Sequence, residues 1–97
     1  MTMVVLVTVV ELHLPAARSL KDKRRVVKGL IERIHARHRV SIAETDFHDL
    51  HQRSEIAIAA VHQSASHVER LLEVIRSQFD EQPEALVVRW EPEFFRA

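Results

Sequence analysis

Basic side chains gather in one stretch of this chain, residues 18–39, and their chemistry is the recognition of negative charge. The stretch holds nine Lys or Arg against two acids, so it carries +7 and the remaining 75 residues carry −7. Guanidinium groups can bind phosphate through two parallel hydrogen bonds, and ammonium groups bind it as point charges. The candidate phosphate-binding residues are Lys21, Arg24, Arg25, Lys28 and Arg37.

Three interpretations of this basic stretch stay open at the level of sequence. It can bind a polyanion such as RNA, it can meet the acidic remainder of a second copy, or it can be a helix face that only water covers. We expect RNA or a ribonucleoprotein as the partner. The alternative is a homodimeric structural or regulatory protein-interaction module with no nucleic-acid role.

A second polar cluster lies between two apolar stretches. It comprises Glu44, Asp46, His48, Asp49, His51 and Arg53. His48 and His51 have the spacing for shared metal ligation if the possible turn at residues 49–52, which His48 precedes, is helical. Hydrogen bonds that brace the turn explain the same residues without a metal, and Glu44 can pair with Arg53. We therefore predict no metal and no cofactor; the histidines at positions 13, 35, 38, 62 and 67 are scattered and indicate surface chemistry.

Several function classes are disfavoured by what the sequence lacks. It contains no cysteine, one glycine, and no serine in a recognisable nucleophile setting, so we predict a protein that is not an enzyme and has no small-molecule substrate. The longest apolar run, residues 3–10, is far short of the roughly 20 residues that span a membrane. We expect a single domain over residues 1–97, located in the cytoplasm.

Hydrophobic periodicity predicts four strands and two helices. Residues 3–14 and 55–62 are apolar on both faces and predict central strands, whereas residues 40–45 and 84–91 predict shorter ones. Ser19 is a good N-cap for a helix that begins near Leu20, and Ser66 with Glu69 forms a capping-box pattern before a second helix that ends ahead of Pro83. Pro92 is expected to end the last strand, leaving Phe94 and Phe95 in a tail that folds back.

The order β-α-β-β-α-β predicts an α+β fold, the ferredoxin-like plait. Its four-stranded antiparallel sheet has the order 4-1-3-2, with both helices on one face. The other face is then uncovered and apolar, which favours a homodimer. Since residues 3–14 and 55–62 contain no Phe, Tyr or Trp, base stacking on this sheet is disfavoured, and the basic helix must carry any RNA binding.

Two segments, SLKDKRRVVKGLIERI at residues 19–34 and VSIAETDFHDLHQRSEIAIA at residues 40–59, resemble the YlxP-like proteins. These are small bacterial domains of unknown function with the ferredoxin-like plait. The second pattern here consists of Ala43, Glu44, Asp46, Asp49, Leu50, Gln52 and Arg53. His51 departs from the family, which usually has Trp there. Some relatives are encoded among transcription and translation genes, so the resemblance implies a role near RNA or the ribosome, and it supplies no catalytic residues.

Overall fold

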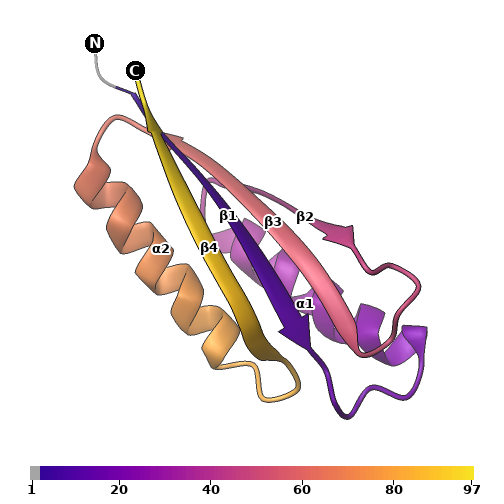
Figure 1. Ribbon diagram of the computed structural model, residues 1–97. Coiled ribbons are helices and arrows are strands. Elements are labelled where there is room, and N and C mark those ends of the chain that lie inside the picture. Colours follow the sequence, from indigo (N-terminus) through magenta and orange to yellow (C-terminus); the bar gives the residue numbers. More distant parts are fainter. Residues whose placement is uncertain (1–2) are drawn as a thin grey trace.

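The computed structural model describes residues 3–97, which fold in the order β-α-β-β-α-β. The elements are β1 (Val4–His13), α1 (Leu20–Arg37), β2 (Ser41–Asp46), β3 (Arg53–His62), α2 (Ala65–Asp80) and β4 (Leu86–Arg96) (Figure 1). The predicted element order is therefore confirmed. No helix in the described part of the chain is both long enough and apolar enough to cross a membrane.

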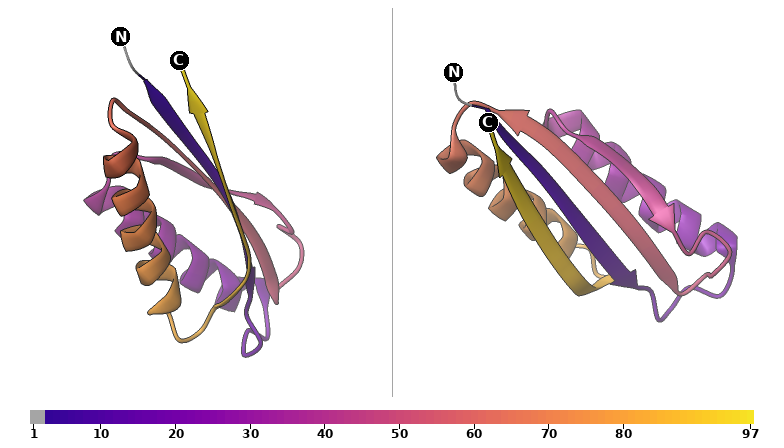
Figure 2. Two further views of the ribbon diagram at one scale, coloured as in Figure 1. Left: turned by 60° about the vertical axis from the view of Figure 1, so that its left-hand side comes forward. Right: turned by 45° about the horizontal axis from the view of Figure 1, so that its top comes forward.

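The four strands form one antiparallel sheet in the order β2-β3-β1-β4. This is the predicted order 4-1-3-2 counted from the opposite edge. Both helices lie on one side of the sheet and leave the other side uncovered (Figure 2). The central strands are β1 and β3, the two strands whose sequences are apolar on both faces, so the ferredoxin-like α+β fold is confirmed.

α1 begins at Leu20, as predicted, because Ser19 caps it. The Ser19 hydroxyl accepts a hydrogen bond from the backbone N–H of Asp22 at 3.1 Å, and the Asp22 carboxylate accepts one from the N–H of Arg18 at 2.9 Å. The stripe that faces the sheet is buried and consists of Lys23, Val26, Val27, Leu30 and Ile34. One charged residue, Lys23, therefore lies within an otherwise apolar stripe.

α2 begins one residue earlier than its predicted cap. Its N-cap is Ser64, whose side chain makes no capping hydrogen bond. The predicted capping box of Ser66 and Glu69 is wrong, because Ser66 already lies inside the first turn. The helix is held instead by burial of its apolar stripe, in which Phe79 meets Trp90 of β4 edge to face with ring centroids 6.1 Å apart.

β4 continues through Pro92, where the sequence predicted that it would end. Pro92 lies opposite Thr8 of β1, and Phe94 and Phe95 lie opposite Leu6 and Val5. Proline is tolerated here because β4 is an edge strand, where a missing N–H that faces solvent removes no ladder hydrogen bond. The predicted folded-back tail is wrong, since both phenylalanines belong to the strand.

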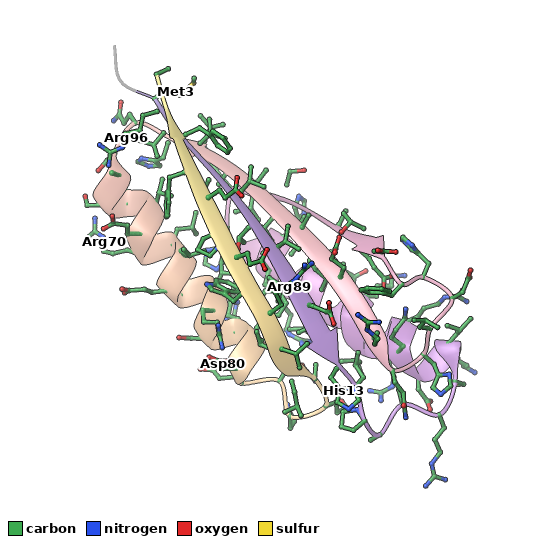
Figure 3. All side chains as sticks on the ribbon, viewed as in Figure 1. Met3, His13, Arg70, Asp80, Arg89 and Arg96 are labelled. Carbon is green, nitrogen blue, oxygen red and sulfur yellow. The ribbon has the colours of Figure 1, made fainter. Side chains whose placement is uncertain are left out.

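The uncovered sheet face has an apolar half and a charged half. Its apolar half lies at the end of the sheet that carries both chain termini. It consists of Val5, Val7, Val9, Ala57, Ala59, Val61 and Phe95, and on the β4 edge the exposed Glu91 and Glu93 lie opposite Val9 and Val7. In the charged half Glu11 lies directly opposite Glu55. Arg53 neutralises Glu11 at 3.0 Å and Arg89 neutralises Glu55 at 2.9 Å. Arg89 is seen over this part of the sheet in Figure 3.

Candidate nucleic-acid interface

Four of the five candidate phosphate-binding residues share the outer face of α1. Lys21, Arg24, Arg25 and Lys28 are all exposed. At about 100° per residue, these positions fall within about 100° of one another around the helix axis and extend over about 10 Å along it. The first half of α1 therefore presents a continuous basic surface, which we call the α1 basic face.

The four residues differ in how far their charge is already neutralised. Arg25 donates a hydrogen bond to Glu84 at 2.7 Å, and this contact raises the pKa of Arg25 above its ordinary value. Lys28 lies 4.0 Å from Glu32 on the next turn. The side chains of Lys21 and Arg24 make no ion pair or hydrogen bond with any residue in the range 3–97. Lys21 and Arg24 therefore carry most of the positive potential of the α1 basic face.

Lys23 lies among these basic residues in sequence, but its side chain is fully buried. Its ammonium group donates to the carbonyl oxygens of Phe47 at 2.7 Å and Arg53 at 3.2 Å, and it lies 3.1 Å from the Glu44 carboxylate. Glu44 also accepts a hydrogen bond from the Ser54 hydroxyl at 2.7 Å. Lys23 thus fastens α1 to the connection between β2 and β3, and it contributes nothing to a surface that binds phosphate.

A signal for this buried pair was present in the sequence. Lys23 falls on the same helical stripe as Val27, Leu30 and Ile34, and Glu44 shares its strand face with the apolar Ile42. A charged residue on each of two inward-facing patterns indicates a pair across the interface of helix and sheet. The predicted pair between Glu44 and Arg53 is wrong, because each residue has another partner.

Arg53 instead contacts β1 and the loop that connects β2 to β3. Its guanidinium group bonds Glu11 at 3.0 Å and lies over the Phe47 ring, 3.9 Å from the ring centroid. Phe47 adopts a positive φ of 63°, a conformation that costs a non-glycine residue of order 1–3 kcal/mol. Contacts of its ring with Arg53 and of its carbonyl oxygen with Lys23 hold it there.

The other residues of the polar cluster make local hydrogen bonds within the loop, and their side chains do not point to one common site. Asp46 accepts a hydrogen bond from the N–H of Phe47 at 2.7 Å, and the His48 ring lies 3.3 Å from the carbonyl oxygen of Glu44. Residues 49–52 form no helical turn, so the geometry that the metal interpretation requires is absent. Within residues 3–97, no three His, Cys, Asp or Glu side chains come together as metal ligands. Asp49 and His51 are exposed and line a cavity of about 340 Å³ together with His13. Figure 3 shows His13 at the end of β1 opposite the chain termini.

Arg37, the fifth candidate residue, lies apart from the α1 basic face. It is the last residue of α1, on the opposite side of the helix from Lys21, and it lines a cavity of about 510 Å³. Two arginines that the sequence interpretation did not single out, Arg39 and Arg70, line the same cavity. Arg70 lies on the first half of α2, toward the end of the molecule that carries the chain termini (Figure 3).

Three of the histidines that are scattered in the sequence also meet at this cavity. His38 follows α1, His62 ends β3 and His67 lies in the first turns of α2. The rings of His62 and His67 pack edge to face with centroids 4.5 Å apart. Positions far apart in the sequence meet here because the end of α1, the end of β3 and the start of α2 lie at one end of the plait. A sequence pattern does not show that proximity until the topology is known.

Among solved structures, the de novo designed protein Foldit4 is similar in fold. It aligns with a TM-score of 0.50 and 16% sequence identity, over 100% of this chain and 97% of its own. At that identity the likeness concerns the fold alone.

The sequence comparisons identify relatives whose function is not known. A curated relative, the uncharacterized protein YlxP of Bacillus subtilis (strain 168), is 38% identical over 68 residues, which cover 70% of this chain and 74% of that protein. Residues 5–91 match the family described as protein of unknown function (DUF503). This chain therefore belongs to the DUF503 family, the YlxP-like proteins that its two sequence patterns resemble.

Proposed function

We propose that this chain is a cytoplasmic, non-enzymatic module that binds RNA or a ribonucleoprotein through the α1 basic face. The observation that carries the proposal is the exposure of Lys21 and Arg24 without an acidic partner in residues 3–97, next to Arg25 and Lys28. An unneutralised cation attracts phosphate and releases its counterions when it binds. Such a surface recognises a backbone rather than a base sequence.

The arrangement of the sheet supports the helix as the contact surface. RNA-binding plaits that use their sheet stack bases on aromatic residues of the two central strands. In this chain the uncovered face of β1 and β3 presents Val and Ala in its apolar half, and Glu11 and Glu55 in its charged half. Aliphatic side chains offer no stacking platform, and the two arginines of the charged half, Arg53 and Arg89, are already ion-paired with these glutamates.

Salt-dependent binding tests this proposal. Four phosphate contacts predict a slope of about −3 for the logarithm of the binding constant against the logarithm of salt concentration, at about 0.7–0.9 per contact. We expect a structured RNA to be retained by the wild-type protein at low salt and released as salt rises. Retention that is unaffected by salt, or no retention at low salt, contradicts the proposal.

A second candidate function, a homodimeric protein-interaction module, is favoured by the apolar half of the uncovered sheet face. Val61 is 65% exposed and Phe95 is 53% exposed, and they flank Val5 in one row across the sheet. Monomers seldom leave a contiguous apolar patch in contact with water, and a two-fold dimer is the commonest way to cover one. A dimer formed through this face would leave the α1 basic face free, so the two functions are compatible.

A further inference from the structure

The cavity between the end of α1 and the start of α2 concentrates positive charge from three separate segments. Arg37 ends α1, Arg39 lies in the connection to β2, and Arg70 lies on α2. None of the three is ion-paired with an acid in the part of the chain that the structure describes. Glu69 and Glu73 belong to the same helix as Arg70, but no carboxylate lines the cavity. These three arginines, which we call the rim of the cavity, are therefore suited to bind an anion, and above all a phosphate.

The same cavity has an apolar part of its lining, which we call the floor. Val61, Leu71 and Val74 line it, and Val61 and Val74 are 65% and 50% exposed. A free inorganic anion would make no use of this surface. A ligand that covers it must carry a flat or bulky apolar part next to its charge, and the volume of about 510 Å³ is in the range of small-molecule sites, about 300–1,000 Å³.

The histidines add groups that suit a nucleobase and a phosphate together. His62 accepts a hydrogen bond at Nδ1 from the N–H of Ser64 at 3.1 Å, so its neutral ring carries the proton on Nε2 and can donate it. The ring of the exposed His67 packs edge to face on His62. Imidazole rings stack on bases, and their N–H groups donate to phosphate oxygens.

From this combination we infer that the cavity binds one nucleotide unit, with its phosphate on Arg37, Arg39 and Arg70 and its base over the apolar floor beside the histidines. The unit can come from a free nucleoside phosphate or from an RNA chain. The RNA source rests on the function proposed above, whereas the cavity itself does not depend on Lys21 or Arg24. Arg37 lies on the opposite side of α1 from Lys21 and cannot join the α1 basic face, whereas in this cavity it can bind the phosphate.

The test is a titration of the full chain with adenosine 5′-monophosphate, followed by the backbone amide shifts of residues 61–62 and 70–74. Inorganic phosphate and adenosine are titrated separately, and a single-stranded oligoadenylate with a 5′-phosphate is used as competitor. The variant Arg39→Gln/Arg70→Gln removes two charges from the rim. The control Arg33→Gln/Arg76→Gln removes two charges from arginines that do not line this cavity.

We expect the monophosphate to shift those amides, and phosphate or adenosine alone to bind at least about tenfold more weakly, since each makes only part of the contacts. The rim variant should weaken monophosphate binding at least about tenfold, and the control should not. Competition by the oligoadenylate at lower concentration than the monophosphate identifies RNA as the source, and failure to compete identifies a free nucleotide.

The inference is overturned if neither the monophosphate nor the oligoadenylate shifts these amides, if phosphate alone binds as well as the monophosphate, or if the rim variant binds unchanged. Arg39 and Arg70 are exposed and unpaired among the described residues, so the variant should fold; a thermal melt checks this. A failure of the cavity to bind the monophosphate does not affect the proposal that the α1 basic face binds RNA. Likewise, a failure of the salt-dependent RNA test does not affect the nucleotide site in the cavity.

Discussion

At the scale of single residues, the most constrained side chain is Lys23. Its ammonium group is fully buried and lies within 3.4 Å of three carbonyl oxygens and one carboxylate oxygen. Removing Lys23 is costly mainly because the carbonyl and carboxylate oxygens around it would remain buried without a hydrogen-bond donor.

We predict that Lys23→Met lowers the free energy of unfolding by about 3–5 kcal/mol, as expected when one member of a buried pair is removed. Lys21→Met is the matched control, because Lys21 is exposed two residues away, and it should change stability by no more than about 0.5 kcal/mol. Urea denaturation measures both. In Lys23→Met/Glu44→Leu, where the stranded carboxylate is also removed, part of the loss should be recovered. Equal stability of the two single variants would contradict this account.

Thr8 presents the opposite case, a polar group with no use in the core. It is fully buried on β1, and its hydroxyl oxygen has no hydrogen-bond partner within residues 3–97. Valine has the same shape without the hydroxyl, and an unpaired buried hydroxyl costs about 1–3 kcal/mol.

Thr8→Val should therefore raise the free energy of unfolding by about 1 kcal/mol or more, measured by urea denaturation. Thr45→Val is the control, since the Thr45 hydroxyl donates to Glu55 at 2.7 Å and its loss should bring no gain. A less stable Thr8→Val protein would show that the buried hydroxyl is satisfied.

At the scale of elements, the sequence identified each helix and strand but not all their ends. α1 was predicted well because both its cap, Ser19, and its apolar stripe are local signals. β4 was cut short at Pro92 because the tolerance of an edge strand for proline depends on its place in the sheet. The cap of α2 was misassigned for a related reason: the stripe that ends in Phe79 positions the helix, and the side chain of Ser64 does not cap it.

Gly29 offers a test of helix energetics in α1. A methyl group at this position would approach only the tip of the Arg33 side chain, at 3.1 Å from Nη1, and that flexible group can move. Close helix packing therefore does not explain the glycine. Gly29→Ala should raise the free energy of unfolding by about 0.5–1 kcal/mol, and the thermal midpoint should rise with it. A lower midpoint would contradict this and would show that the helix needs the absent side chain.

At the scale of the whole molecule, the charge layout of the surface differs from that of the sequence. The +7 of residues 18–39 includes Lys23, which is buried, and Arg25, which Glu84 neutralises. Most of the remaining basic residues lie in two places, the α1 basic face and the cavity at the end of α1, while Arg18 and Arg33 belong to neither. Sequence patterns identified the first place because helical periodicity is local. They missed Arg39, Arg70 and the histidine cluster because tertiary structure alone brings those residues together.

The uncovered sheet face makes a prediction about assembly. If a second copy covers it, Phe95→Asp should convert a dimer into a monomer, because a carboxylate would be buried in the interface. Phe94→Asp places the same charge on the other face of the same edge strand and should leave the dimer intact. Light scattering distinguishes the two variants. A wild-type protein that stays monomeric at about 100 μM, or equal behaviour of both variants, would contradict a dimer whose dissociation constant is micromolar or lower.

We propose that the α1 basic face binds an RNA backbone through Lys21 and Arg24. The most direct test is the salt dependence of RNA binding in two variants of equal net charge. Lys21→Gln/Arg24→Gln removes the two unpaired charges, and Arg33→Gln/Arg76→Gln removes two whose side chains contact Gln82 and Asp80. The binding constant of a labelled structured RNA is measured by anisotropy across a salt series. The slope of its logarithm against the logarithm of salt concentration should be smaller in magnitude by about 1.5 for the first variant and unchanged for the second. Identical slopes for the wild type and both variants would contradict the claim.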